Sequence, residues 1–258
     1  MTHLLGGHRG LVIGVSGENS IGYAVARRFV ELGAHAVVTC RPARQPVCAP
    51  LVERLGVHTV PMEANDDDSV RRAVATAQAI LGGLDFVVHT LVSVRPGVLT
   101  RPLLELTRRD FHDTMDSSCY SLLAVVREAA PALGASAHGR VVTLTSSANR
   151  VLPSYHAVAM AKSALEAQLL HLSAELGPRG ILCNGVAFSL VATDGAKQSV
   201  GGDNALATTQ RIAKRAFTRT TVSAEQVANT AAFFASSLCQ NITGEITTVD
   251  GGFARVYL

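Results

Sequence analysis

The sequence predicts an α/β fold in which one doubly wound parallel sheet is covered by helices on both faces. Three observations support this class. Short apolar runs rich in β-branched residues alternate with amphipathic or alanine-rich segments along the whole chain. No internal repeat or linker interrupts that alternation. A length of 258 residues suits one α/β domain that buries most of its chain, so we expect a single domain spanning residues 1–258.

The apolar runs predict the strands. Valine, isoleucine and similar residues favour extended backbone, and a strand that is covered on both faces is apolar throughout. Runs of this kind cover residues 11–15, 36–40, 58–62, 84–89, 140–145, 181–186 and 245–249. Because helical segments separate them, we expect parallel pairing, with ligands gathered at the carboxyl ends of the strands.

Glycines and capping residues mark the ends of the intervening helices. A helix over residues 21–32 would end at Gly33, and another over residues 68–81 would end at Gly82. Glycine readily adopts the left-handed conformation that follows a last helical turn. Two later helices begin with the spacing of a capping box, at Thr107 with Asp110 and at Ser223 with Gln226.

One polar segment follows the sixth predicted strand. Residues Gly195 to Asn204 include Gly201-Gly202 and show no clear period. We expect this stretch to be irregular and to form part of a mobile substrate flap around residues 195–215.

Composition excludes several classes of protein. The chain is 48% hydrophobic and 17% charged, which is too apolar for a disordered chain, and its net charge of +3 includes no run of like charges to bind nucleic acid. The five cysteines lack metal-site spacing, and their odd number argues against a disulfide framework. No apolar stretch is long enough for a signal sequence or a membrane span. We therefore expect a cytoplasmic protein without a metal site, and with neither nucleic acid nor membrane as a partner.

A glycine-bearing turn follows the first predicted strand. Residues 14–29 read GVSGENSIGYAVARRF, a strand end, a turn and the start of a helix. Such a turn lets backbone N–H groups and the helix N-terminus approach a pyrophosphate, as in Rossmann-like folds. The glycines Gly14, Gly17 and Gly22 stand further apart than in GxGxxG, so for the loop alone an ordinary tight turn is an equally good interpretation.

The ends of the next two strands carry residues that could select the cofactor. Arg41, with Arg44 nearby, follows the second strand, where an acid would favour NAD and an arginine can bind the 2′-phosphate of NADP. We therefore predict NADPH, with NADH possible; the alternative is a pair of solvated loop arginines. Glu63, at the end of the third strand, could accept a hydrogen bond from the adenine amino group or could be a surface acid.

The most informative pair is Tyr155 and Lys162, within the segment LTSSANRVLPSYHAVAMAKSALEA. Seven residues make about two helical turns, so both side chains would face the same way, roughly 10 Å apart. A nearby ammonium group would favour the charged form of the phenol and help it donate a proton to developing oxyanion charge. The alternative is a core tyrosine beside a solubilising lysine. Since the chain has only three lysines, Lys162, Lys197 and Lys214, we favour the catalytic interpretation.

These residues resemble the short-chain dehydrogenase/reductase family and, within it, the divergent branch of enoyl-acyl-carrier-protein reductases. Ordinary members carry Tyr-x3-Lys, whereas Ala159 occupies the place of that lysine here and the pair is Tyr-x6-Lys. The loop GVSGENSIG is similar to the longer loop of enoyl reductases, and Ser118 stands where ordinary dehydrogenases place a catalytic asparagine. The resemblance extends over nearly the whole chain.

The resemblance implies a role for each matching residue. Tyr155, Lys162 and Ser146 would be catalytic, and Lys162 would also bind the nicotinamide ribose. An acyl thioester, carried in some members on an acyl carrier protein, would be the substrate, and the protein would be a homotetramer. The other cofactor-binding residues would be Gly14, Ser20, Ile21, Arg41, Glu63, Ala64, Leu91 and Thr193.

Three departures from the family pattern affect the substrate. Ser146 stands near the place where many enoyl reductases have a second tyrosine. Ser189-Leu190 replaces a common Pro-Gly, and the segment Val92 to Arg95 lacks an expected glycine and adds a charge. We expect an NADPH-dependent reductase of the C=C bond of a 2-enoyl thioester. The alternatives are a carbonyl reductase, of 3-oxoacyl groups or ketones, and a nucleotide-binding protein without turnover.

Overall fold

The structure, a computed structural model, describes residues 4–146, 151, 155–200 and 202–256. Its sheet has parallel strands in the order β3-β2-β1-β4-β5-β6-β7, the doubly wound arrangement that the sequence predicts. The strands are β1 (Arg9–Ile13), β2 (His35–Cys40), β3 (His58–Pro61), β4 (Phe86–His89), β5 (Arg140–Ser146), β6 (Leu182–Phe188) and β7 (Ile246–Val249). Every predicted strand is confirmed, with ends displaced by up to two residues.

The helices alternate with the strands, and both predicted capping boxes are present, at the starts of α4 and α9. The helices are α1 (Ile21–Glu31), α2 (Gln45–Glu53), α3 (Asp67–Leu81), α4 (Arg108–Met115), α5 (Ser121–Ala135), α6 (His156–Leu176), α7 (Asp194–Val200), α8 (Gly202–Arg215) and α9 (Ala224–Ala235). A π-helical turn, η4 (Asp116–Tyr120), joins α4 to α5. Short 3₁₀ turns are η1 (Pro42–Arg44), η2 (Val98–Thr100), η3 (Leu103–Glu105), η5 (Gly177–Arg179) and η6 (Phe253–Arg255). Within the described ranges, none of the helices combines the length and apolar character that a membrane span requires.

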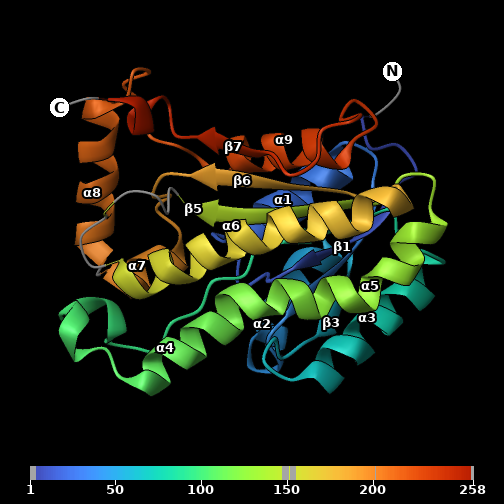
Figure 1. Ribbon diagram of the computed structural model, residues 1–258, viewed down its shortest axis with the longest axis horizontal. Helices are drawn as coiled ribbons and strands as arrows, with labels where there is room; N and C mark the ends of the chain where they lie inside the picture. The colour runs from blue at the N-terminus through green and yellow to red at the C-terminus, as the bar shows by residue number, and fades with distance from the viewer. Residues whose placement is uncertain (1–3, 147–150, 152–154, 201, 257–258) are drawn as a thin grey trace.

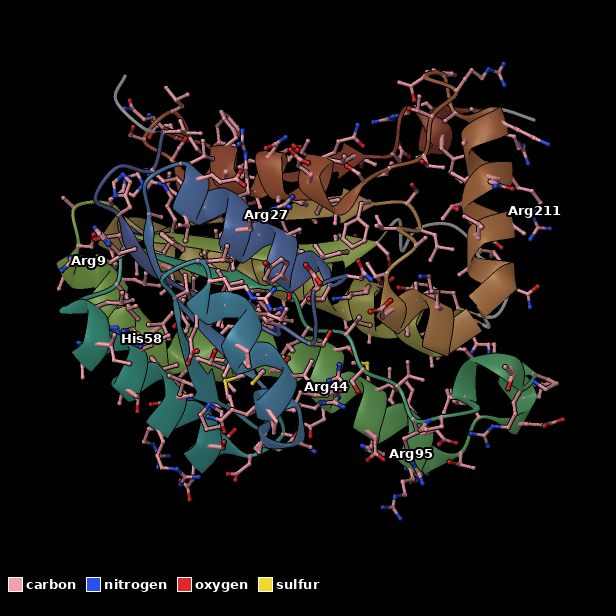
Figure 2. All side chains as sticks on the ribbon, turned by 180° about the vertical axis from the view of Figure 1, so that it is seen from behind. Arg9, Arg27, Arg44, His58, Arg95 and Arg211 are labelled. Atoms are coloured by element: carbon pink, nitrogen blue, oxygen red, sulfur yellow. The ribbon has the colours of Figure 1, made fainter. Side chains whose placement is uncertain are left out.

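The sheet separates two apolar layers. Helices α3, α5 and α6 cover one face, and α1, α2 and α9 cover the other. Figure 1 shows α5 and α6 in front of the sheet. Figure 2, seen from behind, shows the opposite face of the sheet, covered by α1, on which Arg27 is labelled. Typical members of the two cores are Val74, Leu122 and Leu165 on the first face, and Phe29, Val52 and Val227 on the second. This burial on both faces explains why the strands are apolar throughout.

The segment after β6 differs from the prediction. The expectation that Gly195 to Asn204 is irregular is wrong, because α7 covers Asp194–Val200 and α8 begins at Gly202. Thr193 starts α7, since its Oγ1 accepts a hydrogen bond of 3.2 Å from the backbone N–H of Ala196. Buried residues then recur at helical spacing in α8, at Ala205, Thr209 and Ile212. Both helices lie beyond the arrowheads of β5 and β6, at the carboxyl edge of the sheet (Figure 1).

Candidate active site

The glycine loop between β1 and α1 is tightly packed at this carboxyl edge. Gly14 has a φ of +101°, and a Cβ atom there would lie 2.6 Å from Leu91 Cδ2. Ser20 closes the loop, because its Oγ donates to Gly17 O at 2.6 Å and caps α1, which begins at Ile21. A glycine-bearing turn that ends at a helix N-terminus fits a pyrophosphate. The structure therefore brings four of the predicted cofactor residues together: Gly14, Ser20, Ile21 and Leu91.

Two arginines follow β2 beside this loop. Arg44 donates from Nη2 and Nε to Ser16 O, at 2.6 and 3.1 Å, and so lies against the loop itself. Arg41 reaches the loop after β4, where its Nη2 donates to Ser93 Oγ. Both side chains are exposed. A guanidinium group has five N–H donors, so each arginine keeps donors for a phosphate.

The remaining predicted cofactor residues lie along the same edge. Glu63 follows β3, with its backbone N–H donating to Ser69 Oγ at 3.0 Å, and Ala64 packs against the core beside it. Thr193 lines a polar cleft of about 420 Å³ between the start of α1 and the segment after β6. Ser20 lines that cleft too, so the glycine loop and Thr193 share one cavity.

Lys162 is buried where α6 crosses the ends of β4 and β5. Its Nζ donates to Leu91 O at 2.9 Å and to Leu144 O at 2.8 Å. Burial lowers the pKa of Lys162 to about 8, while Cys119 and Glu166 act in the opposite direction. An ammonium group has three donors, so one remains for a ligand. Glu166 is itself held by Thr145, whose Oγ1 donates to Oε1 at 2.8 Å.

Tyr155 immediately precedes the first residue of α6 and faces Ser146 at the end of β5. Burial raises the pKa of Tyr155, and its contact with Ser146 only partly opposes this. The charge of Lys162 is not among the causes of this shift, so the lowering of the Tyr155 pKa that was expected from Lys162 is not found. The Ser146 hydroxyl is buried and has no hydrogen bond of good geometry to the described residues, so it could serve a ligand.

Ser189 was missed as a candidate by the sequence analysis. It directly follows β6, its side chain is buried, and its hydroxyl has no hydrogen-bond partner within the described residues. Ser146 pairs in register with Phe188, so the two unsatisfied hydroxyls lie at neighbouring strand ends. A buried unsatisfied hydroxyl is costly, by about 1–3 kcal/mol, and such groups gather where a ligand completes the bonding. The replacement of Pro-Gly by Ser189-Leu190 was visible in the sequence, but the burial of the hydroxyl was not.

His89 is a second buried group that sequence reasoning did not single out. Its Nδ1 lies 3.1 Å from Thr143 Oγ1 and its Nε2 lies 2.9 Å from Ser121 Oγ. Ser121 uses its own proton to bond Ser117 O, so Nε2 must be the protonated nitrogen. Burial, with a smaller contribution from the charge of Lys162, lowers the pKa of His89 to about 3. His89 is therefore a neutral structural link between β4, β5 and α5.

Ser118 lies in the π-helical turn and holds the loop after β4. Its Oγ accepts from Ser93 N at 2.9 Å and donates to Ser93 O at 3.0 Å. Ser118 therefore fixes the backbone of the loop after β4, at the carboxyl edge of the sheet. Arg95, further along this loop, lies 3.4 Å from the buried carboxylate of Asp110, which Arg101 binds more closely at 2.8 Å, and 3.7 Å from the carboxylate of Asp113. In the described part of the chain, no group of three or more His, Cys, Asp or Glu residues could hold a metal ion.

Known proteins resemble the chain over nearly its whole length. Residues 14–254 match the family model described as enoyl-(acyl carrier protein) reductase. A Rhizobium meliloti protein named enoyl-[acyl-carrier-protein] reductase [NADH] 1 is 31% identical over 256 residues, which cover 98% of this chain and 92% of the relative. A second R. meliloti enoyl-[acyl-carrier-protein] reductase [NADH] is 32% identical over 98% of this chain and 94% of its own length.

Solved structures agree with the sequence matches. The Bacillus cereus enoyl-acyl carrier protein reductase, solved with NADP+ and indole naphthyridinone, superposes with a TM-score of 0.93 at 28% identity, over 99% of this chain and 100% of that one. An Anaplasma phagocytophilum enoyl reductase in complex with NAD gives a TM-score of 0.91 at 26% identity, over 100% and 96% of the two chains. One of these similar structures therefore contains NADP+ and the other contains NAD.

Proposed function

Because this chain belongs to the enoyl-(acyl carrier protein) reductase family of the short-chain dehydrogenases/reductases, we propose that it is an NAD(P)H-dependent oxidoreductase that reduces the C=C bond of a 2-enoyl thioester. One observation carries the proposal. Tyr155 stands before α6, outside the helix, and faces the end of β5, while Lys162 lies two turns further on and is buried against β4 and β5. The names of the relatives support an acyl carrier protein as the carrier of the substrate.

The residues divide the work between substrate and cofactor. The bound cofactor would supply a hydride to the β-carbon of the substrate. Tyr155, kept protonated by burial, would donate to the thioester oxygen as enolate charge develops there. Ser146 would be a second donor to that oxygen. Lys162 would hold the nicotinamide ribose with the N–H that the backbone carbonyls leave free.

A carbonyl reductase is the second candidate, because Ser146 occupies the place of a catalytic serine in ordinary dehydrogenases. In a ketone reductase the donors must bond the same C–O group that receives the hydride. The spacing Tyr-x6-Lys sets Tyr155 three residues further from the lysine than in that arrangement, a rise of about 4.5 Å along a helix. This displacement favours conjugate reduction, in which the donor and the hydride act on different atoms.

A side-by-side assay separates the two activities. We expect crotonyl or longer 2-enoyl thioesters to oxidise the reduced cofactor at least about tenfold faster than the matching 3-oxoacyl thioesters, since a misplaced donor loses most of its effect. The measurement is the fall in cofactor absorbance with both thioesters at equal concentrations. Faster reduction of the 3-oxoacyl compound would make the protein a carbonyl reductase, and firm cofactor binding without any turnover would favour a non-catalytic nucleotide-binding role.

We also propose NADPH as the preferred cofactor. Among the residues that the structure describes, neither arginine after β2 pairs with a carboxylate: Arg44 bonds a backbone carbonyl and Arg41 bonds a serine hydroxyl. Two guanidinium groups beside the glycine loop suit a 2′-phosphate, which an acidic residue at this place would repel.

The substitution Arg41→Ala tests this preference. NADPH should bind the unmodified protein roughly tenfold to a hundredfold more tightly than NADH, because a charge-assisted bond to phosphate contributes about 1.5–3 kcal/mol. Arg41→Ala should remove most of that difference, as measured by calorimetric titration of both cofactors. Arg54→Ala, which changes an exposed arginine at the end of α2, is the control and should alter neither constant. Equal affinity of the unmodified protein for NADPH and NADH would refute the preference.

Three broader features belong to the same proposal. We place the α7–α8 segment, residues 195–215, over the acyl chain as a substrate flap, because it lies at the carboxyl edge of the sheet (Figure 1). Homotetramer formation is supported by apolar side chains left exposed on α4, η4 and α6, namely Phe111, Tyr120 and Leu170. Cytoplasmic location is supported by the five cysteines, all of which are free and buried.

A further inference from the structure

The backbone of the loop after β4 is fixed from two sides. Lys162 binds Leu91 O, and Ser118 exchanges two hydrogen bonds with the backbone N–H and C=O of Ser93. Ser117 adds a third bond, from its Oγ to Ser93 O at 3.2 Å. The position of Ser93 is thus set by α6 and by the π-helical turn, whatever its own side chain does.

The side chain of Ser93 points away from these anchors, toward the end of β2. Its hydroxyl oxygen accepts a hydrogen bond from Arg41 Nη2, across 52 residues of sequence. Arg41 is exposed, and the hydrogen-bond partner that the structure gives its guanidinium is the neutral hydroxyl of Ser93. Ser93, whose backbone is fixed by Ser118, therefore holds the guanidinium group of the exposed Arg41 in one position.

We propose that Ser93 is a positioning residue for cofactor selection, which orders Arg41 so that its guanidinium meets the 2′-phosphate of NADPH. The inference rests on the NADPH preference proposed above. Arginine loses much side-chain freedom when it binds a phosphate, and an arginine that is already ordered loses less. One N–H bonded to Ser93 leaves four for the phosphate.

Affinity for the cofactors, measured without turnover, isolates this role. Calorimetric titration with NADPH and with NADH would compare the unmodified protein with Ser93→Ala and Ser93→Thr. Ser93→Ala keeps both backbone bonds to Ser118 and removes only the hydroxyl. We expect it to weaken NADPH binding roughly three- to tenfold and to change NADH binding less than twofold, while Ser93→Thr restores NADPH affinity. Ser117→Ala is the matched control, because it disturbs the same loop without touching Arg41.

The second arm combines Ser93→Ala with Arg41→Ala. If Ser93 acts through Arg41, the double variant should bind NADPH no more weakly than Arg41→Ala alone. An equal loss of NADPH and NADH affinity would show a merely structural role, and tighter binding of both would show that the contact obstructs the groove; either result overturns the proposal. Unchanged NADPH preference in Ser93→Ala refutes the role of Ser93 and leaves the preference standing. Equal affinities in the unmodified protein refute both.

Discussion

Tyr155→Phe should lower the rate of enoyl thioester reduction by about a hundredfold or more, with cofactor affinity nearly unchanged. The loss of one donor to a developing oxyanion typically has this effect on the rate. In this chain the effect should fall on the chemical step, because burial raises the pKa of Tyr155 and the phenol, in contact with Ser146, stays protonated as a proton donor must. Single-turnover measurements at saturating cofactor, with a crotonyl thioester, would record it directly.

Two further variants, one a control and one a comparison, accompany the Tyr155→Phe measurement. Tyr120→Phe alters an exposed tyrosine of the π-helical turn and should leave the rate unchanged. Lys162→Ala should weaken cofactor binding as well as turnover, because it removes the group that ties Leu91 O to Leu144 O and, in the proposed function, binds the nicotinamide ribose. A Tyr155→Phe protein that reduces enoyl thioesters at the normal rate would exclude Tyr155 as the donor.

Acid should destabilise the fold through His89. The folded state keeps His89 neutral down to a pKa of about 3, whereas the unfolded chain takes up a proton near the ordinary value of 6.5. Between these values the unfolded state binds more protons, so the free energy of unfolding must decrease as the pH falls. The slope is roughly 1.4 kcal/mol per pH unit, and the loss approaches about 5 kcal/mol at pH 3. Above pH 6.5 the contribution is absent, because both states are neutral.

His89→Gln isolates this contribution. Glutamine can accept from Thr143 and donate to Ser121, but it does not titrate. Denaturant unfolding at fixed protein concentration, repeated from pH 7.5 to pH 4, should give a shallower loss of stability in the variant. The His8 and His138 side chains also have lowered pKa values, but both proteins share them, so they cancel in the difference. Parallel pH profiles of the two proteins would show that His89 is not the sensitive group.

Local patterns predicted most of the fold. The strands were visible because burial on both faces requires continuous apolar runs, and the starts of α4 and α9 were visible because a capping box is a contact within four residues. Residues Gly195 to Asn204 were wrongly expected to be irregular because their glycines and polar residues show no apolar period, and the helical period of buried positions begins only after them. That period consists of Ala205, Thr209 and Ile212. It is present in the sequence, but only the packing of the neighbouring elements shows which side of the helix is buried.

Residue type and spacing in the sequence indicated Tyr155 and Lys162 as candidates, and the structure places Tyr155 just before α6 and Lys162 against the ends of β4 and β5. Their catalytic roles stay a prediction. Contacts between distant segments were not predictable in the same way. No pattern links Arg41 to Ser93, and the link exists only because the sheet order places β1 between β2 and β4 and the loop after β4 turns toward β2. The sign of the pKa shift at Tyr155 was missed for a related reason, since burial depends on everything that packs around the ring.

The π-helical turn Asp116–Tyr120 also constrains how the length of the chain can vary. Its hydrogen bonds span five residues where an α-helix spans four, so the turn holds one residue more than regular helix would. One residue corresponds to about 100° of helical rotation. Deleting a single residue here would let the turn relax into α-helix, and the buried face of α5, with Leu122 and Val125, would stay toward the sheet because the π-turn already absorbs the extra residue. A one-residue deletion is therefore absorbed locally at this turn, whereas the same deletion within α5 would rotate the rest of that core helix by about 100°.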